Sequence, residues 1–156
     1  MNLQELADWI SAATANGAVP VLAGRNGDMD TIGSSIALAS SNAKLIACGL
    51  HIGKLAKRLC TELDAPFRKL SKEPNWPKQI GGIIIVDAAS ETQTGVEIPK
   101  DVPICVIDHH DTCDWTFREG DLEIRNNARA TTQIVFEYLK NNSPNSLTDE
   151  VRKLLL

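Results

Sequence analysis

Three short groups of acidic and imidazole side chains stand out in the sequence, and each follows a short apolar run. The first group follows residues 19–23, the second is a single aspartate after residues 83–86, and the third follows residues 102–107. Their members are Asp28, Asp30, Asp87, Asp108, His109 and His110. Carboxylate and imidazole groups together suit Mn²⁺, Fe²⁺ or Zn²⁺ better than Ca²⁺. Enough acids to join two ions would be typical of a two-metal phosphoryl-transfer site.

Each group has a simpler interpretation when it is taken alone. Asp28 and Asp30 could be solvated loop acids or helix caps, and an aspartate such as Asp87 at a strand end often caps the next turn. The third group is harder to explain in this way, because three polar residues directly after an apolar run are costly to bury without partners. His51 has no acidic neighbours in the sequence and is predicted to lie at the surface.

The elements that must position these groups alternate between strands and helices. Strands are expected at 19–23, 44–48, 83–86, 102–107 and 122–125, and helices at 2–15, 32–42, 54–63, 131–140 and 146–156. This order predicts an α/β domain with a largely parallel sheet flanked by helices. Ligands of open parallel sheets bind outside the carboxyl ends of the strands, so the three groups should meet at one edge.

Two local details of the helices can also be predicted. Ser146 and Asp149 fit a capping pair at the start of the last helix. In the helix at 54–63, the residues expected on one apolar face are Leu55, Ala56, Leu59 and Leu63.

The length and composition of the chain limit the classes of protein to which it can belong. The chain has 156 residues, which suggests one domain, and a net charge of −4, which argues against a strongly basic nucleic-acid surface. A nucleotide substrate stays compatible with this charge, because a bound cation can supply local positive charge. None of the four cysteines forms a CxxC pair, the N-terminus does not resemble a signal peptide, and no apolar run approaches a membrane span. We therefore expect a cytoplasmic protein with reduced thiols.

Three segments resemble the first three motifs of the DHH phosphoesterases: residues 26–34, residues 86–88 and residues 107–110. The helix start at 130–135 is also similar to that family, and the resemblance covers roughly residues 19–140. The family includes RecJ single-strand exonucleases, oligoribonucleases, cyclic-dinucleotide phosphodiesterases and manganese inorganic pyrophosphatases. The resemblance implies the fold of a DHH N-terminal domain and Mn²⁺ as the cofactor, with Mg²⁺ as the other option, bound as one or two ions.

The resemblance also implies a role for each matching residue. Asp28 would ligate one ion and Asp30 the other, and Asp87 would bridge the two. His109 would bind the second ion with support from Asp108. His110 would contact the substrate phosphate.

The sequence departs from the family at several positions. Gly24 stands where the family usually has a histidine ligand, and Gly27 and Met29 replace the commoner proline and glycine, changes interpreted as minor. The family has a fourth motif, an acid on a strand after the final helix, and a C-terminal substrate-binding domain. Neither is found before Leu156, so we expect a single DHH domain over 1–156 with an incomplete site.

Three hypotheses follow for the function. The first is metal-dependent hydrolysis of a phosphodiester or phosphoanhydride, such as a nucleic acid or an oligonucleotide, impaired by the missing ligands. The second is a non-catalytic DHH-like scaffold that has a protein partner in a nucleic-acid-processing complex. The third is a receiver-like or nucleotide-binding α/β module in which the acids bind one Mg²⁺, but a receiver needs a lysine at a late strand end and Lys100 precedes its strand.

Overall fold

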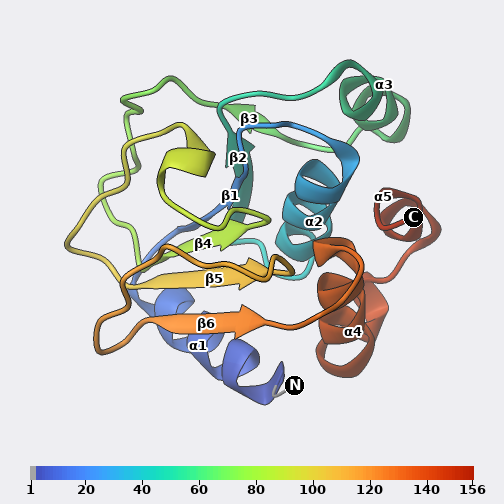
Figure 1. Cartoon of the computed structure of the whole chain (residues 1–156). Coiled ribbons are helices and arrows are strands. Elements are labelled where there is room, and N and C mark those ends of the chain that lie inside the picture. Colours follow the sequence, from blue (N-terminus) through green and yellow to red (C-terminus); the bar gives the residue numbers. More distant parts are fainter. Residues whose placement is uncertain (1–2) are drawn as a thin grey trace.

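A computed structural model describes residues 3–156, and it contains one sheet with helices against one face and loops against the other (Figure 1). The elements in chain order are α1 (Leu3–Asn16), β1 (Val19–Ala23), α2 (Met29–Ala39), β2 (Leu45–Gly49), α3 (Lys54–Leu63), β3 (Arg68–Lys69), β4 (Ile83–Val86), η1 (Thr92–Thr94), β5 (Ile104–Asp108), β6 (Leu122–Arg125), α4 (Thr131–Asn142), η2 (Pro144–Ser146) and α5 (Asp149–Leu154). Residue 2, where the first helix was expected to begin, lies outside the described residues.

The sheet is parallel throughout, in the order β3-β2-β1-β4-β5-β6. The arrowheads of β4, β5 and β6 accordingly point the same way in Figure 1. β1 pairs with β4, and β4 pairs with β5. The three strands that precede the polar groups are therefore neighbours, and the predicted α/β fold with a parallel sheet is confirmed.

Alternate side chains of the central strands face two different layers, as the two-residue period of a strand requires. Ile84 and Val86 pack with apolar residues of α1 and α4. Ile83 and Ile85 pack on the opposite face against the loops, which contribute Val96 and partly buried aromatic side chains. Because both faces are covered, these strands read as continuous apolar runs in the sequence.

Several boundaries differ from the expected ones. α2 begins three residues early because Asp28 is its N-cap. α5 is capped by the hydroxyl of Thr148, which accepts from the backbone N–H of Val151, so the predicted cap at Ser146 is wrong. β3 was not predicted at all.

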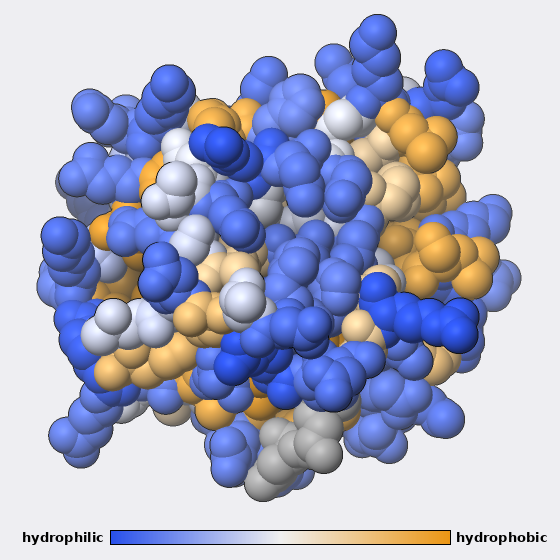
Figure 2. All heavy atoms as spheres, viewed as in Figure 1, coloured by the Kyte–Doolittle hydropathy of each residue, from blue (hydrophilic) through white to orange (hydrophobic). Residues whose placement is uncertain are grey.

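The apolar face expected for α3 is wrong at one position. Ala56 is buried, but Leu55 is 67% exposed. Figure 2 shows apolar atoms gathered on the side of the molecule where α3 and α5 lie. Met29, Leu55, Leu59 and Leu156 line a shallow pocket there. No helix within residues 3–156 is long and apolar enough to cross a membrane.

Candidate metal centre

The loop after β1 is tied to the end of β4 by a threonine. Thr31 Oγ1 accepts from the backbone N–H of Gly24 at 2.6 Å and donates to the carbonyl of Val86 at 3.2 Å. Asp28 Oδ1 in turn accepts from the backbone N–H of Thr31 at 3.1 Å. These contacts fix the first turn of α2, which carries Asp30, beside the carboxyl end of β4.

Asp87 follows β4 in an unusual backbone conformation. Its φ is +62°, in the left-handed region that few residues other than glycine adopt, although aspartate and asparagine tolerate it. Its backbone N–H donates to the carbonyl of Ile107 at 2.9 Å, and the residue is only 5% exposed. Such backbone outliers cluster at functional positions, so the geometry marks Asp87 independently of its charge.

The three sequence groups converge around His109. Its Nε2 lies 3.3 Å from Asp87 Oδ1 and 3.4 Å from Asp30 Oδ2. Three donors at the start of α4 hold the two carboxyl groups. The backbone N–H groups of Thr131 and Thr132 donate to the two oxygens of Asp30 at 3.1 and 2.9 Å, and Thr131 Oγ1 donates to Asp87 Oδ1 at 3.1 Å. The positive end of the α4 dipole therefore faces both acids.

The surroundings of Asp87 disfavour the ionised form of its carboxyl group. Burial, and next the negative charge of Asp30, raise the pKa of Asp87 to about 8. An adjacent cation would favour the ionised form and reverse this shift. The cluster offers two carboxyl groups, each with an oxygen within 3.4 Å of His109 Nε2, and an imidazole, and such a set fits a divalent ion.

Asp108 lies behind this cluster and pairs with a different histidine from the one expected. Its side chain is 2% exposed, and its Oδ1 lies 2.5 Å from His110 Nδ1. The resemblance assigned Asp108 to the support of His109, whereas the hydrogen bond in the structure goes to His110. Asp108 Oδ2 is buried with no hydrogen-bond partner among the described residues.

The two histidines lie side by side, with ring centroids 4.5 Å apart. Ligand atoms of Asp87, His109 and His110 lie within 4.8 Å of one another, a spacing that could hold a metal ion. Asp28 is more peripheral. It is exposed, its Oδ1 caps α2, and its charge is the smallest of the causes that raise the pKa of Asp87.

Asp30, Asp87, His109 and His110 therefore lie close together. Asp108 forms a hydrogen bond with His110, and Asp28 lies at the edge of the cluster. Sequence reasoning missed the contribution of Thr131 and Thr132. The helix start at 131 was the available signal, but nothing in it indicated that its N–H groups would reach Asp30.

The two glycines of the first motif are packed too tightly for the family's usual residues. A Cβ on Gly24 would lie 2.9 Å from the carbonyl oxygen of Asp87, so a histidine there would require the backbone to shift. Gly27 has a φ of +65°, and a Cβ on it would lie 2.8 Å from the carbonyl oxygen of His51. Proline is fixed near a φ of −65° and cannot replace it without rebuilding the loop.

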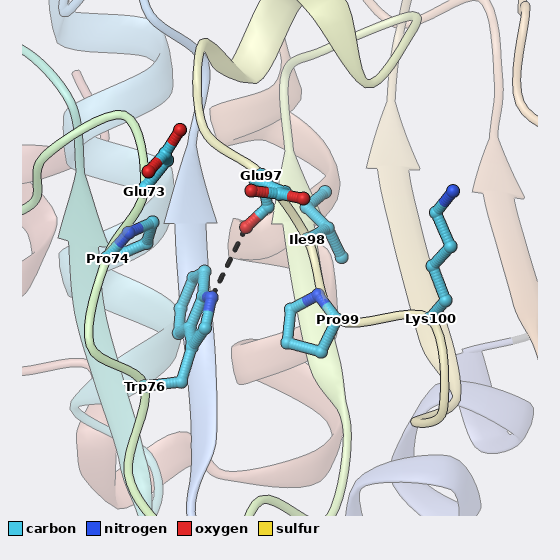
Figure 3. A pocket seen from close by; sticks show the side chains of 7 residues that line it. All are labelled: Glu73, Pro74, Trp76, Glu97, Ile98, Pro99 and Lys100. Carbon is cyan, nitrogen blue, oxygen red and sulfur yellow. Dashed lines mark hydrogen bonds between the residues drawn. The ribbon is translucent and has the colours of Figure 1, made fainter.

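A separate hollow lies away from this cluster. A cavity of about 280 Å³ lies among the loops, and the indole N–H of Trp76 donates there to the carbonyl of Glu97 at 3.2 Å (Figure 3). Lys100 also lines this cavity, and none of the six candidate residues does.

Comparisons with known proteins identify the family and the fold. The model of the DHH family, N-terminal domain, matches residues 18–156. A candidate family II inorganic pyrophosphatase from Methanococcus jannaschii has a similar structure, with a TM-score of 0.68 and 20% identity over 88% of this chain and 46% of that one. An exopolyphosphatase-related protein from Bacteroides fragilis gives a TM-score of 0.71 and 12% identity over 98% of this chain and 47% of that one.

The chain thus spans less than half the length of either of these solved structures. No curated protein sequence matches it significantly. The family match covers most of the chain and leaves no support for a receiver-like module. The chain belongs to the DHH family.

Proposed function

We propose that this chain is the metal-binding domain of a hydrolase that cleaves a phosphodiester or phosphoanhydride bond. The position of His109 Nε2 within 3.4 Å of a carboxyl oxygen of both Asp30 and Asp87, at the carboxyl edge of the sheet, carries this proposal. These residues would hold one ion, with Asp28 and Asp87 available to a second. Mn²⁺ fits the mixed carboxylate and imidazole donors better than Mg²⁺ does. A bound ion would supply an activated water and stabilise charge on phosphate oxygens.

A phosphoanhydride is the first substrate to test. The two structural neighbours are named for a pyrophosphatase and an exopolyphosphatase, whose names refer to pyrophosphate and polyphosphate. Short oligonucleotides and single-stranded nucleic acid are the second class, as the wider family suggests. A cytoplasmic location is part of the proposal, since four free cysteines are typical of a reducing compartment.

The test is hydrolysis of pyrophosphate, a short oligonucleotide and a chromogenic phosphodiester by residues 1–156, with Mn²⁺ or with chelator. We expect slow turnover that needs Mn²⁺, because the family's histidine is absent at Gly24. Asp87→Asn should abolish it, since asparagine keeps the left-handed backbone and removes the charge. Asp64→Asn is a matched control, because Asp64 is an exposed aspartate with a φ of +52° at the end of α3.

A scaffold without catalysis is the second candidate, and the packing at Gly24 favours it. The space that the family's histidine would need is bounded by the Asp87 carbonyl and the Thr31 hydroxyl, so this chain has closed the position as well as lost the ligand. Turnover that equals the Asp87→Asn background for every substrate, in protein shown to bind Mn²⁺, would establish the scaffold.

A further inference from the structure

One ring nitrogen of His110, Nδ1, forms a hydrogen bond with the buried carboxyl group of Asp108. When Asp108 is ionised it can only accept hydrogen bonds, and His110 Nδ1 is then the donor in their contact. In a neutral imidazole the other nitrogen, Nε2, then carries a lone pair that can bind a metal. The hydrogen bond thus selects the tautomer in which His110 can serve as a ligand.

The position of His110 suits that role. Its side chain is 43% exposed, so it can adjust, and its ring lies beside that of His109. The ligand atoms of Asp87, His109 and His110 are within 4.8 Å of one another. Ligands of a tetrahedral ion at the usual bond lengths lie about 3.4 Å apart, so the side chains would have to move closer together to bind one ion.

We propose that His110 is itself a metal ligand in this chain, and that it binds one divalent ion through Nε2 together with Asp87 and His109. The inference rests on the proposed function, because it requires the cluster to bind metal. It departs from the role that the family resemblance gives His110, which is contact with the substrate phosphate. It also predicts selectivity, because a site with two imidazole nitrogens prefers Mn²⁺, Co²⁺ or Zn²⁺ to Mg²⁺.

Asp108 then has a defined purpose as the residue that positions His110. Ligating histidines commonly donate their other N–H to a carboxylate, which fixes the ring and raises its basicity as a ligand. Such a role explains why a carboxyl group that is 2% exposed is kept at the end of β5 with a single hydrogen-bonding residue among those described.

The experiment measures Co²⁺ and Mn²⁺ binding to residues 1–156 by calorimetry in phosphate-free buffer, with the visible spectrum of bound Co²⁺ as a second readout. His110→Asn is the main variant, because its side-chain amide can still donate to Asp108 while Nε2 is removed. We expect it to weaken binding by at least tenfold and to change the Co²⁺ spectrum. Asp108→Asn should weaken binding by about 10–100-fold.

His51→Asn is the matched control, since it removes the remaining histidine of the chain from a position outside the cluster, and it should bind as the wild type does. Equal affinity and an unchanged spectrum in His110→Asn would overturn the inference. So would a defect that appears only when inorganic phosphate is added, because that result would assign His110 to the phosphate. Absence of Co²⁺ and Mn²⁺ binding in the wild type would instead overturn the metal-dependent function itself.

Discussion

Asp87 combines a strained backbone with a carboxyl group that is hard to ionise. Its pKa is raised to about 8, first by burial and then by the charge of Asp30, whereas the ordinary value is 3.8. Stability from the protonated group is therefore fully present below about pH 4 and is lost as the pH rises through about 8. In metal-free protein this acid should weaken the fold at alkaline pH.

Replacing Asp87 should flatten that pH dependence. In chelator, the wild type should lose unfolding free energy between pH 5 and pH 8.5, and Asp87→Asn should lose less by at least about 1.4 kcal/mol, the equivalent of one pKa unit. Urea unfolding at both pH values measures this difference. Asp64→Asn should follow the wild type. If the wild type and Asp87→Asn lose the same unfolding free energy between the two pH values, Asp87 ionises normally in the folded protein.

Thr131 should matter most when Asp87 is ionised. Its hydroxyl is buried and donates to Asp87 Oδ1, so Thr131→Val removes that hydrogen bond. We expect a cost of about 1–3 kcal/mol at pH 8.5, measured by urea unfolding, and a smaller cost at pH 5. Thr131→Ser keeps the hydroxyl and should lose less. If Thr131→Val and Thr131→Ser lose the same unfolding free energy at both pH values, the hydrogen bond from Thr131 does not stabilise the Asp87 carboxylate.

The site was predictable to the extent that it depends on strand ends. Asp87 and His109 meet because parallel strands bring their carboxyl ends to one edge, and that followed from the apolar runs before them. The Asp108–His110 contact and the N–H groups that hold Asp30 were not predictable. The latter lie 101 and 102 residues from Asp30, and no spacing rule connects residues so far apart.

Among the elements, the central strands were the most predictable, because burial on both faces leaves an unbroken apolar run. β3 gave no such signal, since it consists of two exposed residues, Arg68 and Lys69, which pair with the end of β2. Asp28 was among the helix-cap candidates, yet the start of α2 was placed at residue 32, and the structure shows that the side chain of Asp28 caps this helix.

The approach of α2 to α5 gives a prediction at this scale. A Cβ on Gly33 would lie 2.1 Å from the carbonyl oxygen of Leu154 in α5. Gly33→Ala should therefore destabilise the fold by about 1–3 kcal/mol, although alanine is the better helix former. Urea unfolding gives the free energy, and faster tryptic cleavage at Arg152 or Lys153 would report that α5 has been displaced.

The neighbouring residue provides the control. Ser34 is fully buried, and its hydroxyl has no hydrogen-bond partner among the described residues. Ser34→Ala removes that unsatisfied group and should be neutral or stabilising. Equal stability of Gly33→Ala and Ser34→Ala would mean that α5 can move away without loss of unfolding free energy. The contact with Leu154 would then not constrain α2.

The domain places the four candidate aspartates at one edge of the sheet, and the six candidate residues include no lysine or arginine. Metal binding should consequently appear as a global change in stability, because an ion that binds only the folded state shifts the unfolding equilibrium. The same ion removes the penalty that Asp87 imposes at alkaline pH.

Thermal unfolding in Mn²⁺ tests this coupling. At ten times the dissociation constant, binding should stabilise the fold by about 1.4 kcal/mol, a rise in Tm of roughly 3–6 °C for a domain of this size. The ion competes with the proton on Asp87, so at a fixed Mn²⁺ concentration the shift should grow as the pH rises toward 8. Asp64→Asn should keep the shift and Asp87→Asn should lose it. A Tm that stays flat across millimolar Mn²⁺, with Asp87→Asn more stable than the wild type, would exclude the metal site and favour the scaffold.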